Sequence, residues 1–304
     1  MTQRYSPAAR LALAALMAGV LAAGGCRKSA APSAETAAAP ANPDEKRYPL
    51  KGEVVRADAE RKVLLVTHEE IPGYMPAMTM EFRVSPGDLA NAKPGQRIRA
   101  EMVERKGEYS LEKIWPDDSV TVRALDASAK SLAQDTSLRG RGVYREIGEQ
   151  APDFTLLDQE GRTVTASRLR GKKVMLNFIF TRCPIATMCP ASTMKMSALQ
   201  QAAKKAGVTD VEFVSLTLDP DYDTPGVLKD YAAARGLDLS NWSFLTGPDA
   251  AVRHLLAQLG IIREFEGATI KHNLATLLIA PDGRIIHRVD GSQWGTEDFL
   301  PRMQ

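Results

Sequence analysis

The sequence predicts two folded domains of different classes, a small all-β barrel of the OB type followed by an α/β domain. Five short β-type runs, punctuated by Gly and Pro, lie within residues 47–116, as expected for a small barrel. From residue 147, continuous apolar strands alternate with amphipathic helices, which indicates a parallel-containing sheet covered on both faces. The segment TRCPIATMCP, which holds Cys183 and Cys189, directly follows the apolar run KVMLNFIF, where open α/β sheets place their sites.

The first 26 residues predict an export signal and a lipid anchor. Arg4 and Arg10 precede an apolar stretch that is too short and too rich in Gly and Ala for a membrane-spanning helix. The stretch ends in AGGC, which resembles the lipobox of bacterial lipoproteins, although Ala23 stands where Leu is more usual. We expect Cys26 to be the lipidated first residue of a mature periplasmic chain. A soluble secreted chain with a free Cys26 and an uncleaved membrane anchor are the alternatives.

The segments outside the two domains carry no binding signal of their own. Residues 27–46 are rich in Ala and Pro, which is typical of a disordered tether. Residues 117–146 are polar, with a short helix in LDASAKSLAQ, and are predicted to be a connector.

The net charge of the whole chain is close to zero, with 39 Lys and Arg against 37 Asp and Glu, so we expect no nucleic-acid partner.

The predicted barrel gathers thioether and imidazole side chains. Met78 and Met80 are two apart on the predicted strand 78–84, so both project from one face. His68 ends the preceding strand, and Met75 lies in the loop between the two strands. Thioethers with an imidazole favour Cu(I) over hard cations, which prefer oxygen. Alternating methionines also commonly fill a core, so the spacing alone leaves both interpretations open.

The segment HEEIPGYMPAMTMEF resembles the metal-binding segment of the periplasmic copper chaperone of the Cus silver/copper efflux system. That small β-barrel uses one His and the two Met of an MTM strand. The resemblance covers residues 48–116 and implies that His68, Met78 and Met80 bind Cu(I). Where that family has a copper-capping Trp, this chain has Met75, which offers a third thioether and removes the aromatic cap.

The α/β domain has a thioredoxin-like order of elements. A hairpin around DQEG precedes the buried strand KVMLNFIF, and the pair of cysteines lies in the loop that leaves this strand. The elements predicted after the loop are the helix ASTMKMSALQQAAKKAG, the strand VEFVSLTLD, the helices TPGVLKDYAAARG and PDAAVRHLLAQLG, and the hairpin ATLLIAPDGRIIHRV.

Three chemistries are common on such a fold, and the residues discriminate among them. A disulfide exchanger usually has CxxC facing a cis-Pro, whereas this chain has CxxxxxC and no Pro between Pro248 and Pro281. The TxxC pattern of a peroxiredoxin is missed by one residue at Thr181-Arg182-Cys183. Two thiolates and an imidazole, here His272 in KHN, fit a copper site.

Residues 147–295 resemble the Sco/SenC family of copper-binding, thioredoxin-fold proteins, which help to assemble the binuclear copper centre of cytochrome c oxidase. The matching stretches are APDFTLLDQEGRTVTASRLRGK, FIFTRCP with the later CP, LDPDYDTPGVLKDYA and ATLLIAPDGRII. The resemblance implies that Cys183, Cys189 and His272 ligate copper, foremost as Cu(I) and also as Cu(II). It also implies that Asp219 lies beside the site in a supporting role.

The cysteine spacing departs from the CxxxC of that family. Residues four apart lie about 40° apart around a helix, whereas residues six apart lie about 240° apart. Cys183 and Cys189 therefore cannot share a helix face. Pro184 disfavours helix at the residue before it, so we expect an extended loop to present Cys183. The two extra residues allow a disulfide but alter its geometry and its potential.

Together these observations predict a lipid-anchored periplasmic metallochaperone. It would bind Cu(I) and deliver it to the subunit of cytochrome c oxidase that carries the binuclear copper centre, or to another periplasmic acceptor. One alternative is a thiol-disulfide reductase with Cys183 or Cys189 as the attacking thiolate, and another is copper sequestration for tolerance. The predicted segments are the signal 1–26, the tether 27–46, the barrel 47–116, the connector 117–146 and the thioredoxin-like domain 147–304.

Overall fold

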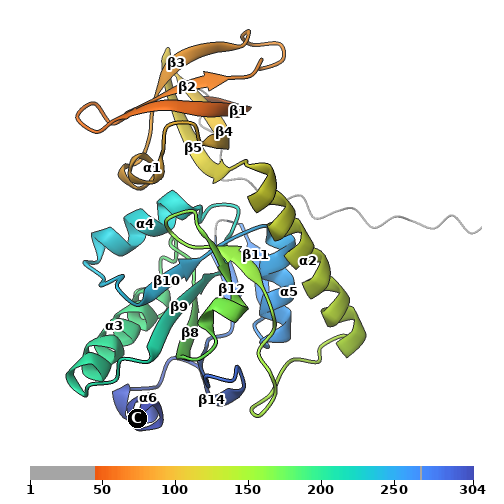
Figure 1. Ribbon diagram of the computed structural model, residues 1–304, viewed down its shortest axis with the longest axis vertical. Coiled ribbons are helices and arrows are strands. Elements are labelled where there is room, and N and C mark those ends of the chain that lie inside the picture. The colour runs from red at the N-terminus through yellow and green to blue at the C-terminus, as the bar shows by residue number, and fades with distance from the viewer. Residues whose placement is uncertain (1–44, 268) are drawn as a thin grey trace, which may run out of the picture. The chain divides into compact units, whose positions relative to one another are not determined.

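The computed structural model describes residues 45–267 and 269–304 (Figure 1). The predicted lipoprotein signal with Cys26 lies outside the described residues, as does most of the predicted tether. Strand β1 (Glu45–Asp58) begins two residues before the predicted barrel boundary, so Glu45 and Lys46 belong to the barrel and not to the tether. None of the helices in the described part of the chain has the length and apolar character needed to cross a bilayer.

Five strands close into a barrel in the order β1-β2-β3-β5-β4, which confirms the predicted all-β domain. Alternate residues point inward, and Leu50, Val54 and Phe82 are buried in the barrel core. A short helix, α1 (Pro86–Asn91), was not predicted; the Ser85 side chain caps it by accepting a hydrogen bond from the Asp88 backbone N–H. The remaining strands are β2 (Val63–His68), β3 (Met78–Arg83), β4 (Arg97–Arg105) and β5 (Glu108–Pro116).

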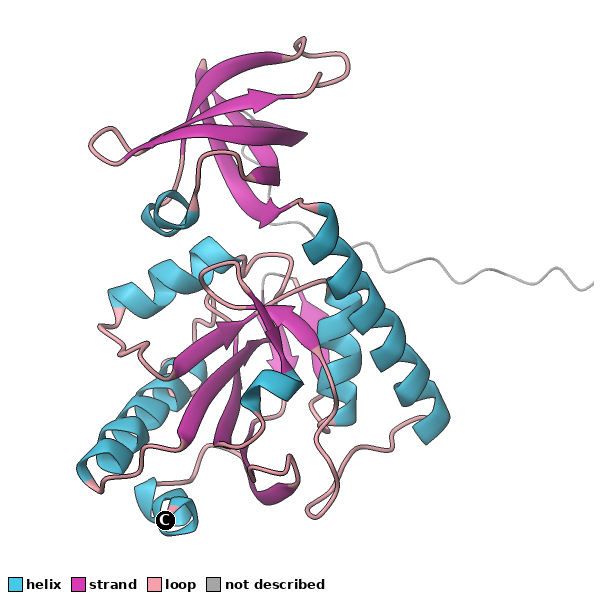
Figure 2. Ribbon diagram, viewed as in Figure 1, coloured by secondary structure: helices cyan, strands magenta, loops and turns pink. Residues whose placement is uncertain are grey.

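The second domain is built on a sheet of five strands in the order β10-β9-β8-β13-β14, with helices flanking it (Figure 2). The strands are β8 (Lys173–Ile179), β9 (Val211–Thr217), β10 (Trp242–Leu245), β13 (Ala275–Ile279) and β14 (Ile285–Asp290). The first three run parallel, and β13 pairs antiparallel with both β8 and β14. All of β13 and nearly all of β8 and β9 are buried. The predicted parallel-containing sheet, covered on both faces, is confirmed.

The helices of this domain begin close to their predicted positions, but three of its smaller elements were not predicted. These are strand β10, the hairpin of β11 (Arg263–Glu266) with β12 (Thr269–His272), and helix α6 (Thr296–Met303). The hairpin strands are four residues each and mostly polar, so they lack the apolar alternation that marks a strand. The other elements are β6 (Thr155–Leu157), β7 (Thr163–Thr165), the 3-10 helix η1 (Ala166–Leu169), α3 (Cys189–Lys205), α4 (Pro225–Ala234) and α5 (Asp249–Gln258).

The predicted connector is dominated by one long helix, α2 (Ser119–Arg139), which packs against α5. Its N-cap Asp118 accepts a hydrogen bond of 2.9 Å from the Thr121 backbone N–H. Leu132 is buried in the core of the α/β domain, and the Gln258 side-chain amide donates to the Leu132 carbonyl at 3.1 Å. Few apolar residues face the core, so the sequence shows little helical periodicity beyond the short stretch that was predicted.

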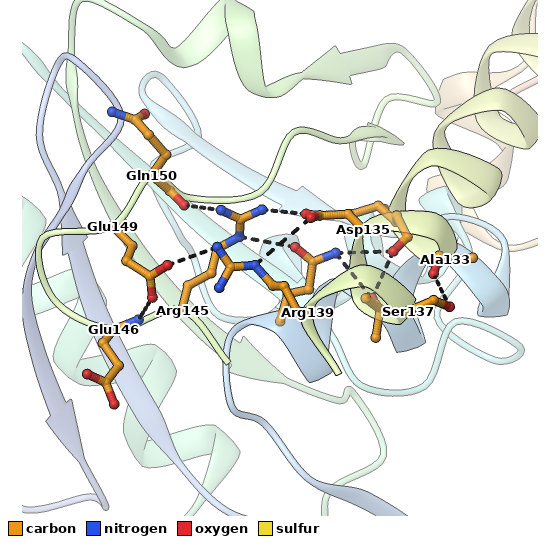
Figure 3. A network of polar contacts seen from close by, with 11 residues as sticks. Ala133, Asp135, Ser137, Arg139, Arg145, Glu146, Glu149 and Gln150 are labelled. Atoms are coloured by element: carbon orange, nitrogen blue, oxygen red, sulfur yellow. Dashed lines mark hydrogen bonds and ion pairs between the residues drawn. The ribbon is translucent and has the colours of Figure 1, made fainter. Parts of the chain in front are cut away.

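Polar contacts hold the end of α2 to the chain that leads into β6 (Figure 3). The Arg145 guanidinium donates to the Asp135 carboxylate of α2 and, at 2.9 Å, to the Gln150 carbonyl. Arg139 of α2 donates to the Glu149 carboxylate at 2.9 Å. Hydrogen bonds to charged groups are stronger than neutral ones. Helix α2 is therefore part of the α/β domain and not a loose linker.

Replacing Leu132 by Ala should lower the free energy of unfolding of the α/β domain by about 3 kcal/mol, because it leaves a cavity in the core. Leu138→Ala on the same helix is the matched control, since Leu138 is 80 % exposed and Leu132 is 2 % exposed; it should cost less than about 0.5 kcal/mol. Urea unfolding followed by circular dichroism measures both. Equal costs for the two variants would contradict the placement of α2 in the core.

Candidate functional site

The two cysteines lie where the central strands end. Strand β8 pairs in parallel with β9, with Ile179 opposite Thr217, so the loops that follow these strands leave the same edge of the sheet. Cys189 is the first residue of α3, and Cys183 lies in the irregular segment before it. The loop presentation of Cys183, predicted from its spacing and from Pro184, is confirmed.

The two thiols differ in environment. Both cysteines are free; Cys189 is 1 % exposed and Cys183 is half-buried. Burial raises the pKa of the Cys189 thiol above its usual range, a hydrogen bond from the Phe180 backbone lowers it, and the neighbouring Cys183 raises it again. Burial thus disfavours the thiolate form of Cys189 in this environment.

His272, the last residue of β12, meets Cys189 across the site. Its Nε2 lies 3.8 Å from the Cys189 sulfur, and its Nδ1 lies 2.9 Å from the Asn273 carbonyl oxygen. Since the carbonyl only accepts, Nδ1 carries the proton and Nε2 presents a lone pair to the sulfur. Burial lowers the pKa of His272, against the hydrogen bond to Asn273, which raises it. The edge of the ring packs against Phe180 at 5.8 Å between centroids.

The unpredicted hairpin holds His272 in place through its neighbours. The Asn273 side chain accepts a hydrogen bond of 2.7 Å from the Ile262 backbone N–H and donates one of 2.9 Å to the Gly260 carbonyl. Arg263, opposite His272 in the hairpin, donates to the Leu218 carbonyl at 3.0 Å. The hairpin is thereby fixed to the loop that follows β9.

Two acidic residues of that loop accept hydrogen bonds from the two residues that precede Cys183. Asp219, which was predicted to lie beside the site, is buried and accepts hydrogen bonds of 3.1 and 2.6 Å from the Arg182 guanidinium. Asp223 is also buried and accepts from the Thr181 backbone N–H at 3.2 Å, from the Thr181 hydroxyl, and from the Thr217 hydroxyl at 2.5 Å. Burial raises the pKa of Asp223 to about 7, although the hydrogen bonds from Thr181 and Thr217 lower it.

Sequence reasoning missed Asp223. The signal available was an acidic residue two positions before Pro225 at the start of a predicted helix, in a loop that leaves a buried strand. Such a residue is ordinarily interpreted as a helix cap or a turn residue.

The structure brings Cys189 and His272 together and places Cys183 on the adjoining loop. Within residues 45–267 and 269–304, no three or more His, Cys, Asp or Glu side chains are close enough to enclose a metal ion. The three predicted ligands therefore share one edge of the sheet without forming a closed ligand set.

In the barrel, His68 and the two predicted methionines lie on paired strands. His68 is opposite Met78, and Val66 is opposite Met80, in the register of β2 and β3. The His68 Nδ1 donates to the Glu69 carbonyl at 2.7 Å. Its Nε2 is buried and has no hydrogen-bond partner among the described residues. Burying a lone pair without a partner is costly, and this lone pair is available to a ligand.

The loop with Met75 connects the ends of β2 and β3 at which His68 and Met78 lie. Ile71 and Met75 form a β-bridge, with hydrogen bonds of 2.9 and 3.1 Å between their backbones. Met75 packs partly buried against the barrel core, whereas Met78 is 46 % exposed. Thioethers are therefore available at this end of the barrel from both the loop and the strand.

Two family models match the chain, one for each domain. The model described as SCO1/SenC matches residues 144–303. The model described as copper binding periplasmic protein CusF matches residues 47–116. These ranges agree with the two regions in which the sequence resembles known families.

Individual relatives match the second domain. The SCO1 protein homolog of Bacillus subtilis is 31 % identical over 159 residues, which cover 50 % of this chain and 79 % of the relative. A SCO2-like protein of Rickettsia felis is 36 % identical over 89 residues, 29 % of this chain and 42 % of the relative, so the match spans less than half of that protein. The crystal structure of a SCO1/SenC family lipoprotein from Bacillus anthracis is similar with a TM-score of 0.48 and 28 % identity, over 53 % of this chain and 97 % of that one.

Cys183 should react with iodoacetamide at least tenfold faster than Cys189 at pH 7.5, because the thiolate is the reactive form and Cys189 is buried with a raised pKa. Mass spectrometry of Cys189→Ser and Cys183→Ser, each retaining one of the two thiols, measures the two rates separately. Equal rates would show that α3 does not shield Cys189.

Proposed function

Because the chain belongs to the SCO1/SenC family, we propose that it is a copper metallochaperone that binds Cu(I) at two sites and delivers it to a copper-accepting protein. One observation carries the proposal. Both His68 and His272 donate Nδ1–H to the carbonyl of the following residue; Nε2 of His68 is left buried without a partner, and Nε2 of His272 faces the Cys189 sulfur. Metal-ligating histidines ordinarily have this arrangement.

In the α/β domain, the proposed ligands are Cys183, Cys189 and His272. Two thiolates and a neutral imidazole are soft ligands that select Cu(I) and also accommodate Cu(II). Cys189 and His272 are already adjacent at 3.8 Å, so the segment with Cys183 would complete the site. Asp219 supports this segment through its ion pair with Arg182.

In the barrel, the proposed ligands are His68, Met78 and Met80, with Met75 as a further thioether from the loop. Neutral thioethers need no deprotonation and are not redox-sensitive thiols, so this site suits capture of Cu(I) in an oxidising compartment. The matching family model is described as copper binding, which supports the assignment.

The two sites together suggest a direction of transfer. The uncharged barrel site would hold Cu(I) more loosely than the pair of thiolates, so copper would pass from the barrel to the α/β domain. A short covalent connection gives an effective concentration on the order of millimolar, which favours transfer within one chain. Equal Cu(I) affinities at the two sites would remove the thermodynamic basis of this direction.

The proposed acceptor follows from the resemblance to the Sco/SenC family. It is the subunit of cytochrome c oxidase that carries the binuclear copper centre, or another periplasmic copper protein. Lipid attachment at Cys26 would hold the chain at a bacterial membrane in the periplasm. Copper sequestration for tolerance uses the same two sites and differs only in having no acceptor.

An anaerobic Cu(I) titration of the chain lacking residues 1–26 should give two coppers per chain by metal analysis. Cys183→Ser/Cys189→Ser and Met78→Leu/Met80→Leu should each give one, since each double variant removes the sulfur ligands of one site. Met194→Leu is the control, because Met194 is an exposed thioether of α3 outside both sites, and it should keep two coppers. If the parent chain binds a single copper, and only Met78→Leu/Met80→Leu abolishes it, the cysteine pair would have a redox role and would not bind copper.

A thiol-disulfide reductase is the second candidate, and the free thiols favour it. A half-buried Cys183 beside a buried Cys189 has the asymmetry of an attacking and a resolving thiol. His272→Ala should reduce copper at the α/β site at least tenfold while leaving disulfide exchange with a model substrate within threefold. His254→Ala is the control. If His272→Ala loses copper but still supports maturation of the copper-accepting partner, the reductase is favoured instead.

A further inference from the structure

We propose that Asp223 is a positioning residue for the cysteine pair. Its buried carboxylate fixes the residues that precede Cys183 and thereby sets both the copper affinity of the α/β site and the dithiol-disulfide equilibrium of Cys183 and Cys189. The part that concerns copper rests on the proposed function, whereas the part that concerns the thiols does not.

Cys183 needs support from outside its own segment. Cys189 is held by α3 and is buried in the core of the α/β domain. Cys183 lies in an irregular segment and packs only partly buried against that core; its backbone N–H donates to the Phe180 carbonyl at 3.2 Å, and its sulfur lies 3.8 Å from the Ile185 carbonyl. The position of Cys183 therefore depends on how the chain is held just before it.

Asp223 holds that chain against the neighbouring strand. One carboxylate accepts hydrogen bonds from Thr181, two residues before Cys183, and from Thr217 at the end of β9. Because β8 and β9 are adjacent parallel strands, Asp223 joins their carboxyl ends at the point where the cysteine loop begins. Asp223 and Thr217 are fully buried, and Thr181 is half-buried, so water has little access to the carboxylate.

The directions of these hydrogen bonds require two acceptor oxygens. The Thr217 hydroxyl oxygen accepts from the Asp219 backbone N–H at 2.9 Å, which leaves its proton for Asp223. The Thr181 backbone N–H can only donate. An Asn in place of Asp223 has almost the same size, but it offers one oxygen and turns an amide N–H toward these donors, so at least one buried donor loses its partner.

The contact of Asp219 with Arg182 is a weaker candidate for this role. The Arg182 side chain is 35 % exposed, whereas that of Asp219 is 2 % exposed. Arg182 also stacks over the exposed Tyr222 ring at 4.2 Å. A long guanidinium at the surface leaves the backbone more freedom than a direct bond to the Thr181 N–H. Asp223 therefore restrains the backbone of the segment with Cys183 more tightly than Asp219 does.

The test compares Asp223→Asn with Asp221→Asn in the full chain at pH 8. Asp221 is an exposed residue of the same loop, so the control makes the same chemical change without touching Thr181. Two properties are measured. The first is the Cu(I) affinity of the α/β site, in competition with a chromophoric chelator. The second is the thiol-disulfide equilibrium of Cys183 and Cys189 with oxidised and reduced dithiothreitol. In the second reaction, the two thiols lose two electrons and two protons to oxidised dithiothreitol and form one disulfide.

Asp223→Asn should lower the Cu(I) affinity at least tenfold. It should also lower the equilibrium constant for disulfide formation about tenfold, which raises the reduction potential by about 30 mV, because the two thiols meet less often. Asp221→Asn should stay within twofold of the parent chain in both. The proposal is overturned if Asp223→Asn is folded and also stays within twofold in both measurements.

Thr181 supplies a second test in case Asp223→Asn does not fold. Thr181→Val removes the hydroxyl donor and keeps the shape, whereas Thr181→Ser keeps the donor. Both variants must first show the parent melting temperature. The proposal is supported if Thr181→Val lowers the Cu(I) affinity and the equilibrium constant for disulfide formation while Thr181→Ser keeps both. It is overturned if both variants keep both values. If the parent chain binds no copper at the cysteines, the proposed function fails at this site, and the dithiothreitol equilibrium still decides the role of Asp223.

Discussion

The parallel pairing of β8 with β9 is the constraint on which the α/β site depends. Because Ile179 lies opposite Thr217, the loop with Cys183 and the loop with Asp219 and Asp223 leave the sheet side by side. The hairpin with His272 is tied to the second of these loops through Arg263 and the Leu218 carbonyl. All of the groups proposed to act on copper in this domain thus follow from one strand pair and what is attached to its carboxyl ends.

The two domains orient a histidine ring in the same way on unrelated folds. His68 lies on a barrel strand and His272 at the end of a hairpin, yet each ring donates Nδ1–H to the next carbonyl and keeps Nε2 free. The neighbouring sulfur groups differ: Met78 is paired with His68 across β2 and β3, whereas the buried thiol of Cys189 faces His272. The same imidazole geometry with uncharged sulfur in one domain and ionisable sulfur in the other is the physical reason for the unequal Cu(I) affinities that we propose.

The sequence predicted those parts whose signals are local. Apolar runs and alternation located the barrel strands and β8, and Pro184 with the cysteine spacing placed Cys183 in a loop before α3. The parts of helix α2 outside LDASAKSLAQ and the β11–β12 hairpin were missed because their stabilising contacts, such as Arg139 with Glu149 and the Asn273 amide with Gly260, come from other segments. Asp223 was missed for the same reason, because its partners become neighbours only once β8 and β9 pair.

The central claim is that Nε2 of His68 and His272 binds Cu(I), and long-range proton–nitrogen NMR of the histidine side chains tests it most directly. The chain has four histidines, so His254 and His287 serve as internal controls. Addition of Cu(I) is predicted to shift Nε2 of His68 and His272 while their Nδ1 nitrogens keep the shift of a protonated nitrogen, and to leave the two controls unchanged. Binding through Nδ1, or no change at either ring, would contradict the account.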